Sequence, residues 1–278
     1  MAETALYRYY NQIEAAFIKH FRKTSQKLKP ERIHKLRVDI KRIRAIFKLL
    51  DFSCKEEFDK TEQLEALSQL FKVAGRLREV QVNLMQIGDP SHPETKLYMQ
   101  YLEGKEKKAL IRFEKKMKAF NLEHYIKRNK PVKKLIEDFN DEKVMTKSKE
   151  FLENEIKEII KLQSDLFNEK RLHKIRIHLK SMEAITKLLA DIIPGDEFKN
   201  LSGSIQSLGL MVGDWHDKQM LIRSIKKYVR KNKGGAEAKK IMHLKEKIEK
   251  ECAEMECVFE QQLNKLVHGI PNGRFKLN

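Results

Sequence analysis

Five side chains between residues 33 and 48 have the types and the spacing needed to bind a chain of negative charges. They follow one another at steps of three, four, three and four residues, so on a helix they fall within an arc of roughly 80°. Arginine and lysine bind phosphate oxygens, and histidine adds a positive charge when it is protonated. No acidic side chain interrupts this basic stripe, which consists of His34, Arg37, Lys41, Arg44 and Lys48.

An apolar stripe lies beside the basic one. One residue before each cation the chain carries an apolar residue, which places the second stripe about 100° away around the helix. One face of this helix is therefore predicted to enter a core, while the neighbouring face presents positive charge. The apolar residues are Ile33, Leu36, Ile40, Ile43 and Phe47.

The same pattern returns half a chain later. The sequence LHKIRIHLKSMEAITKLL, which starts at Leu172, aligns with IHKLRVDIKRIRAIFKLL, which starts at Ile33, at an offset of 139 residues. The second copy departs from the first at Glu183, which occupies the position of Arg44. Glu183 is three residues from Lys180, so we expect it to neutralise part of the second stripe. The cations that the copy retains are His173, Arg176 and Lys180.

A second repeated segment follows each basic stripe. GRLREVQV, which starts at Gly75, aligns with GDWHDKQM, which starts at Gly213, at an offset of 138 residues. Glycine inside a helix costs about 1 kcal/mol relative to alanine. Its presence at both equivalent positions therefore predicts that another helix comes close there.

Composition favours a helical, polyanion-binding protein. The 278 residues are 41% hydrophobic and 35% charged, with 11 Gly and 6 Pro, and the net charge is +18. Residues 19–48 alone hold 12 Lys or Arg and two acids, which suggests a site. The three cysteines form no CxxC pair, and no apolar run approaches the roughly 20 residues of a membrane helix. Without a signal-peptide pattern at the N-terminus, we expect a cytoplasmic protein with no metal, no cofactor and no membrane contact.

The periodicity predicts an all-α fold built from two copies of a four-helix unit. The first repeat is expected within residues 1–135 and the second within 139–270. Ser53 with Glu56 is predicted to cap the third helix, and Ser91 with Glu94 the fourth. Residues 121–140 are expected to form a connector with a short helix interrupted near Pro131. The eight expected helices cover about 4–28, 33–51, 53–87, 91–120, 142–167, 169–192, 198–231 and 236–267.

The doubled HxxRxxxK helix resembles the CHAD domain, the conserved-histidine α-helical domain. The paired segments that start at Gly75 and Gly213 are similar to a second signature of the same family, and the resemblance covers residues 1–278. It implies two pseudo-symmetric four-helix bundles around a basic central cleft, and non-catalytic binding of inorganic polyphosphate. It also implies association with polyphosphate granules. By this likeness the binding residues are His34, Arg37, Lys41 and Arg44, with His173, Arg176 and Lys180, and Lys48 continues the first stripe.

Three other interpretations remain open from the residues alone. An ordinary solvated helix face explains many charge runs, but such a face normally mixes both signs. A nucleic-acid-binding protein would suit the net charge, although no aromatic residues alternate with the basic stripe. A phosphoanhydride hydrolase would need acids to hold a metal, and the first stripe has none. The cluster of Asp214, His216 and Asp217 does not place its three side chains on one helical face, so it is not predicted to bind a metal.

The presence of Glu183 predicts that the two halves bind a polyanion unequally. An Arg37/Lys41/Arg44 triple alanine variant should lose more polyphosphate affinity than an Arg176/Lys180 double alanine variant, because the first stripe has no internal carboxylate. Titration of both variants with long-chain polyphosphate tests this. Equal affinities of the two variants would show that the halves contribute alike.

Overall fold

The computed structural model describes residues 3–54, 56–88, 95–163, 169–192, 197–232 and 236–268, and within them the regular structure is entirely α-helical. The predicted all-α class is therefore confirmed. The helices are α1 (Ala5–Gln26), α2 (Pro30–Ser53), α3 (Lys60–Ile87), α4 (Lys96–Lys118), α5 (Leu122–Glu137), α6 (Asp141–Gln163), α7 (Glu169–Ile192), α8 (Glu197–Lys231) and α9 (Ala236–His268).

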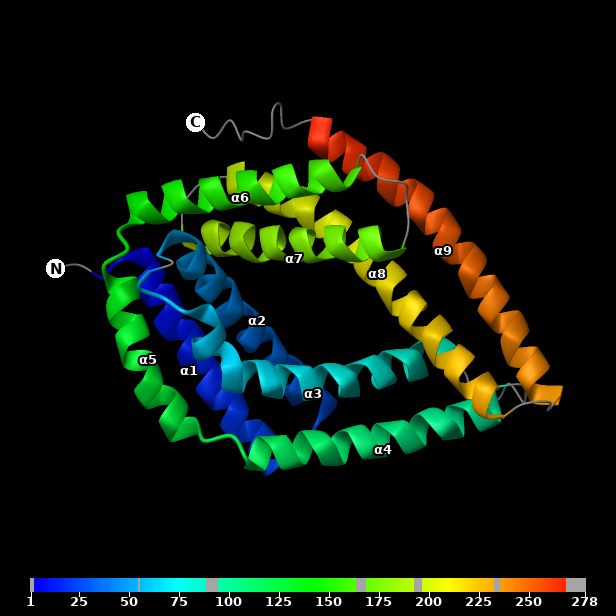
Figure 1. Ribbon diagram of the computed structural model, residues 1–278. Coiled ribbons are helices and arrows are strands. Elements are labelled where there is room, and N and C mark those ends of the chain that lie inside the picture. Colours follow the sequence, from blue (N-terminus) through cyan, green and yellow to red (C-terminus); the bar gives the residue numbers. More distant parts are fainter. Residues whose placement is uncertain are drawn as a thin grey trace.

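Helices α2, α3, α7 and α8 lie around the centre of the molecule, with α1, α4, α5, α6 and α9 outside them (Figure 1). In the N-terminal half α1 packs on α2, α2 on α3 and α3 on α4. The C-terminal half follows the same order, with α6 on α7, α7 on α8 and α8 on α9. The halves meet mainly where α2 contacts α7 and α3 contacts α8. The two helices with repeated basic stripes are therefore direct neighbours.

The apolar stripes of α2 and α7 form the core that holds these helices together. All five apolar residues predicted on α2 are 3% exposed or less, and the matching residues of α7 are 1% exposed or less. Burying a side chain of this size contributes about 1.5–3 kcal/mol. Because the basic stripe lies about 100° away on the same helix, burial of the apolar stripe fixes the direction in which the cations point. The matching residues of α7 are Leu172, Ile175, Leu179 and Met182.

The predicted start of α3 was wrong. The second helix continues through Ser53, and Asp59 caps α3 by accepting hydrogen bonds from the backbone N–H groups of Thr61 at 2.7 Å and Glu62 at 3.2 Å. Leu49 and Leu50 are fully buried, so packing extends α2 through Ser53, which therefore does not cap the next helix. Local capping residues indicate possible helix ends, and the burial of apolar side chains determines which of these ends forms.

The predicted connector at residues 121–140 is instead a continuous helix, α5, with Pro131 inside it. A proline in a helix interior lacks one N–H donor and costs about 3 kcal/mol. Tertiary contacts offset this cost: Asn129 donates to the buried Glu14 of α1 at 2.9 Å, and the Lys133 ammonium lies 2.5 Å from the same carboxylate. Five helices therefore occupy residues 5–137, rather than the four expected before residue 135.

The remaining helix ends agree closely with the expected ranges. Within the described residues, α7 spans 169–192 as predicted, while the predicted cap at Ser91 and Glu94 and the predicted helix end at Phe167 lie outside them. None of the helices that the structure describes is long and apolar enough to span a membrane.

Candidate functional site

The two basic stripes come together where α2 packs on α7. The pKa of Lys41 is lowered, first by burial among neighbouring protein atoms and then by repulsion from Arg37, Lys180 and Arg176. Glu183 opposes this shift. Such repulsion weakens with distance, so cations 139 residues apart in the sequence are close neighbours in space. The Lys41 side chain remains exposed to solvent and is accessible to a ligand.

The third helix adds a cation that the sequence analysis did not assign to the site. Arg78 lowers the pKa of His34, after burial and together with Lys41 and Arg37. Burial, followed by repulsion from Arg78, also lowers the pKa of Arg37 to about 10. Arg78 lies in the repeated segment that starts at Gly75. The repetition of this segment is the sequence feature that could have indicated a role for Arg78 in the site. We call the following side chains the central basic cluster: His34, Arg37, Lys41 and Arg44 of α2, Arg78 of α3, and Arg176 and Lys180 of α7.

Phe71 of α3 fixes two guanidinium groups of this cluster. The Arg37 guanidinium carbon lies 4.4 Å from the centre of the Phe71 ring, and that of Arg44 lies 5.0 Å from it. Arg37 Nη1 also donates to the Phe71 carbonyl at 3.0 Å, and Arg44 Nη1 donates to Ser68 Oγ at 3.3 Å. The two arginines are thus held in place before any ligand binds, which lowers the entropy cost of binding.

The predicted close approach of another helix is found at Gly75, through a side chain of α2, but not at Gly213. At Gly75 a Cβ atom would lie 3.1 Å from Arg37 Nη1, so this glycine makes room for a side chain of the central basic cluster. At Gly213 a Cβ atom would meet no atom within 4 Å. The glycine that is crowded in the C-terminal half is Gly209, four residues earlier, where a Cβ would lie 3.1 Å from Glu183 Oε2.

Glu183 neutralises part of the second stripe, as its position in the sequence predicted. Its carboxylate lies 2.8 Å from the Lys180 ammonium and 2.7 Å from that of Lys187. Burial acts to raise the pKa of Glu183, but the hydrogen bonds from the two lysines outweigh it and keep the pKa below its usual value. Glu183 is therefore ionised at neutral pH, and it occupies the position where the N-terminal half has Arg44.

Arg176 lies on the C-terminal side of the cluster. Its Nε atom is buried and has no hydrogen-bond partner in the described part of the chain. Burial lowers the pKa of Arg176, and the Asp217 carboxylate on α8 opposes this shift. The central basic cluster and its two neighbouring acids, Asp217 and Glu183, together hold six Lys or Arg and carry a net charge of +4 with histidine neutral.

His173 lies at the edge of this arrangement, against α8. Its ring centroid is 5.7 Å from that of His216, and burial, followed by repulsion from Arg176, His173 and Arg223, lowers the pKa of His216 to about 4. His216 is therefore neutral at physiological pH. Within the described residues no three His, Cys, Asp or Glu side chains are grouped as metal ligands would be.

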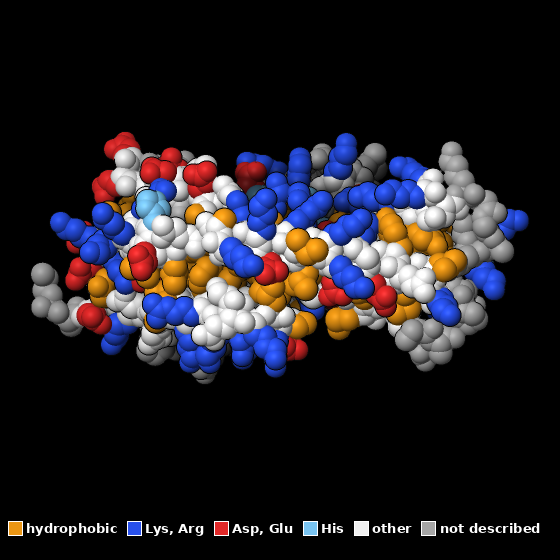
Figure 2. All heavy atoms as spheres, turned by 90° about the horizontal axis from the view of Figure 1, so that it is seen from below, with side chains coloured by type: hydrophobic (Ala, Val, Ile, Leu, Met, Phe, Trp, Pro, Cys, Tyr) orange, Lys and Arg blue, Asp and Glu red, His pale blue; other side chains and the backbone are white. Residues whose placement is uncertain are grey.

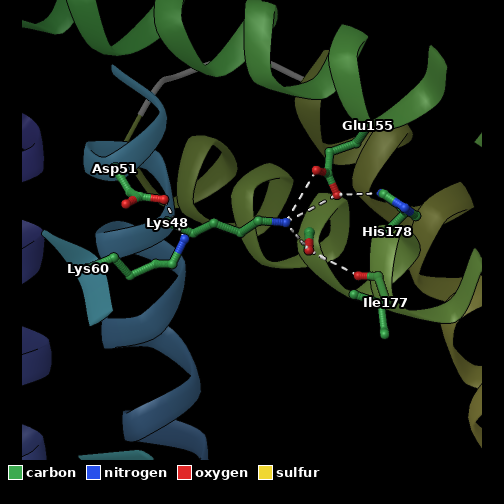
Figure 3. A network of polar contacts seen from close by, with 7 residues as sticks. Lys48, Asp51, Lys60, Glu155, Ile177 and His178 are labelled. Atoms are coloured by element: carbon green, nitrogen blue, oxygen red, sulfur yellow. Dashed lines mark hydrogen bonds and ion pairs between the residues drawn. The ribbon is translucent and has the colours of Figure 1, made fainter. Parts of the chain in front are cut away.

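Lys48, the fifth cation of the first stripe, is directed away from the cluster into an ion pair between the halves (Figure 3). Its ammonium lies 3.2 Å from Oε1 of the buried Glu155 on α6, and it donates to Ser181 Oγ on α7 at 2.6 Å. His178 Nδ1 lies 3.2 Å from the other Glu155 oxygen. The central basic cluster therefore contains six of the eight predicted residues, whereas His173 lies at its edge and Lys48 has an internal partner.

Comparison with known proteins accounts for this architecture. A family model, the CHAD domain, matches residues 12–128, which include the first basic stripe and Arg78. The N-terminal part of the chain therefore resembles the CHAD domain family in sequence. The resemblance drawn from the doubled histidine motif is thus confirmed.

The fold of a solved CHAD domain extends over nearly the whole chain. The crystal structure of the CHAD domain from the plant Ricinus communis is similar, with a TM-score of 0.68 at 15% sequence identity. The match covers 95% of this chain and 93% of the plant chain. No curated protein sequence matches. The C-terminal half is thus part of the CHAD fold, although the family model matches only as far as residue 128.

Because Lys48 pairs with the buried Glu155, we expect Lys48 to stabilise the fold. We expect no such stabilisation from Lys41. Lys48→Met should lower the free energy of unfolding by about 1–3 kcal/mol, because it leaves the Glu155 carboxylate buried without its main counterion. Lys41→Met removes repulsion from Arg37, Lys180 and Arg176, which only the attraction of Glu183 opposes, and should leave stability unchanged or raise it. Urea unfolding of both variants measures the difference.

A second substitution separates charge from packing. The double variant Lys48→Met/Glu155→Gln should recover most of the lost stability, because neither partner then leaves a buried charge. If Lys48→Met is as stable as Lys41→Met, Lys48 is not a structural residue and belongs with the cations that a ligand can reach.

Proposed function

We propose that this protein binds inorganic polyphosphate, without catalysis, at the central basic cluster. The observation that carries the proposal is the convergence of both repeated stripes, with Arg78, on one region where positive charge exceeds negative charge. The geometry is in place without a ligand, because Phe71 and Ser68 already hold Arg37 and Arg44. An anion supplies the charge that the protein leaves uncompensated there.

Polyphosphate suits this cluster better than a compact anion does. Its negative charge repeats along a flexible backbone, so it can contact α2, α3 and α7 at the same time. Arg37, Arg44 and Arg176 offer forked donors to phosphate oxygens, while Lys41 offers a point charge at the exposed surface. Polyphosphate has no nucleobase that an aromatic side chain would have to stack on. Accordingly, the aromatic residue next to the cluster, Phe71, is covered by two arginines and is not available for stacking.

The environment of the acids around the cluster supports the proposal of a non-catalytic role. Glu183 is engaged by two lysines, and Asp217 lies beside Arg176, so each carboxylate already has cationic neighbours. Hydrolysis of a phosphoanhydride with a divalent metal needs carboxylates that are available as ligands. We propose that the two acids adjust the net charge of the cluster. The bound polyphosphate then dissociates without being hydrolysed.

A competition titration tests the function. Labelled long-chain polyphosphate bound to the protein at physiological salt should be displaced by unlabelled polyphosphate at far lower phosphate concentration than by single-stranded RNA or duplex DNA. Affinity should fall steeply as salt rises, because binding releases counterions. More effective displacement by RNA or DNA would contradict the proposal, and release of inorganic phosphate during the assay would show catalysis.

The lowered pKa of His34 predicts a pH dependence of binding. In the free protein burial and three nearby cations hold this pKa below 6.5, so His34 is neutral at pH 7. A bound polyanion reverses the repulsion and raises the pKa, so binding takes up a proton. Affinity should therefore increase as pH falls from about 6.5.

The control for this prediction is His34→Gln, which keeps a hydrogen-bonding side chain but cannot become charged. Its affinity should change less between pH 7.5 and pH 5.5 than that of the wild type, roughly by the factor of a few that one added charge contributes at an exposed site. An identical pH profile for the two proteins would exclude His34 as a source of the pH dependence.

A further inference from the structure

The dense positive charge of residues 19–48 is divided between two places in the structure. Only four of its side chains belong to the central basic cluster. Residues 19–35, before Arg37, hold seven Lys or Arg and one acid, a net charge of +6. Six of these seven cations are exposed, on the last turns of α1, the turn into α2 and the start of α2. They are Lys19, Arg22, Lys23, Lys27, Lys29 and Lys35.

Packing between aromatic rings adds cations from α4 to the same end of the molecule. The ring centroids of Phe21 near the end of α1 and Phe120 just after α4 are 5.0 Å apart, and Phe17 lies 6.1 Å from Phe120. These contacts hold the C-terminal ends of α1 and α4 together. The last turn of α4 carries the exposed Lys115 and Lys118. We call these two lysines and the six exposed cations of residues 19–35 the terminal basic surface.

Acids of the protein leave this surface largely uncompensated. Among the described residues Lys118 pairs with Glu114 at 2.8 Å, and none of the other seven cations has a carboxylate within salt-bridge distance. The negative ends of two helix dipoles favour cations in the last turns of α1 and α4. That effect does not reach Lys19, which lies two turns before the end of α1, nor Lys35, which lies inside α2. The charge is therefore in excess of what the helix ends require.

The terminal basic surface is continuous with the central basic cluster. Arg32 of α2 donates from Nη1 to the Lys23 carbonyl at 2.6 Å, which joins the start of α2 to the end of α1. From Lys41 to Lys29 the path along α2 is about 18 Å long. Arg32, Lys35 and Arg37 lie between them with one exposed acid, Glu31, so this stretch keeps a net positive charge. A flexible chain bound at the centre can leave along the N-terminal turns of α2.

Figure 2 views the molecule from the side on which α4 and the end of α1 lie. Lys and Arg side chains extend over much of this face, and Asp and Glu side chains gather mainly toward one end of it. Uneven charge of this kind attracts an anion over a distance and keeps it near the surface.

We propose that the terminal basic surface is a second contact region for the same polyphosphate chain, so that this protein distinguishes long chains from short ones. The proposal rests on the proposed function and adds chain-length selectivity to it. A short chain occupies the central basic cluster alone. A long chain fills the centre and continues along the start of α2 onto the ends of α1 and α4, where each additional ion pair strengthens binding.

The test compares two ligands and three variants of the full chain at physiological salt, by calorimetric or fluorescence titration. The ligands are tripolyphosphate, which is too short to extend along α2, and long-chain polyphosphate. The terminal variant is Arg22→Gln/Lys23→Gln/Lys27→Gln, and the central variant is Lys41→Gln/Lys180→Gln. The matched control, Lys157→Gln/Lys247→Gln/Lys250→Gln, removes three exposed cations of α6 and α9.

The terminal variant should bind long-chain polyphosphate about tenfold more weakly, with its salt dependence reduced by about two in the slope of log K against log salt. Its affinity for tripolyphosphate should stay within about twofold of the wild type, as should both affinities of the control. Equal losses for both ligands, a loss no greater than that of the control, or no loss for either ligand would overturn the proposal.

The central variant tells a failure of this proposal from a failure of the proposed function. It should weaken binding of both ligands, because both occupy the centre. If it binds both as the wild type does, the central basic cluster is not the site and the proposed function fails, whatever the terminal variant shows. If it weakens both while the terminal variant changes neither, the function stands and chain-length selectivity is excluded.

Discussion

Repulsion between cations that come from both halves of the chain is the constraint on which this structure depends. Lys41 lies among Arg37, Arg176 and Lys180, and burial, followed by repulsion from these cations, lowers the pKa of its ammonium. Repulsion between partly exposed charges amounts to about 1 kcal/mol or less for each pair. Each buried apolar residue of the neighbouring stripe contributes about 1.5–3 kcal/mol. Packing therefore outweighs repulsion, and the fold can keep a site that is unfavourable until an anion binds.

The two halves use similar sequences to build different electrostatic environments. In the first half Phe71 supports Arg37 and Arg44. In the second half the equivalent of Phe71 is Gly209, and the space is occupied by Glu183 and Lys180. A salt bridge inside the protein competes with a ligand for the same lysine, so the second half presents less charge. The order of helix contacts is the same in both halves, but the side chains at equivalent positions present different amounts of positive charge.

Lysines of one helical stripe can serve opposite purposes. Lys41 and Lys48 are two turns apart on α2, yet Lys41 stays exposed near other cations while Lys48 binds the buried Glu155. The difference comes from α6, which passes Lys48 and supplies a carboxylate there. The exposed part of the stripe therefore ends where α6 packs on α2, and its other cations lie toward the start of α2.

Sequence periodicity by itself determined the helical class, the repeat and which face of α2 and α7 is buried, because the 3.6-residue period forces apolar side chains onto one side. It also identified Glu183 as a neutralising residue, since a carboxylate three residues from one lysine and four from another meets both on a helix. These features depend on neighbours within a turn or two, where sequence spacing and distance in space agree.

Tertiary structure decided everything that depends on contacts across the fold. It extended α2 through Ser53, kept α5 helical through Pro131, placed Arg78 in the central basic cluster and paired Lys48 with Glu155. Lys48 and Glu155 are 107 residues apart, so no local pattern could reveal that pair. Contacts between residues far apart in the sequence also divide the basic stretch of residues 19–48 into two surfaces. Charge density is a property of the sequence, but the direction in which each charge points is set by the core that its helix helps to build.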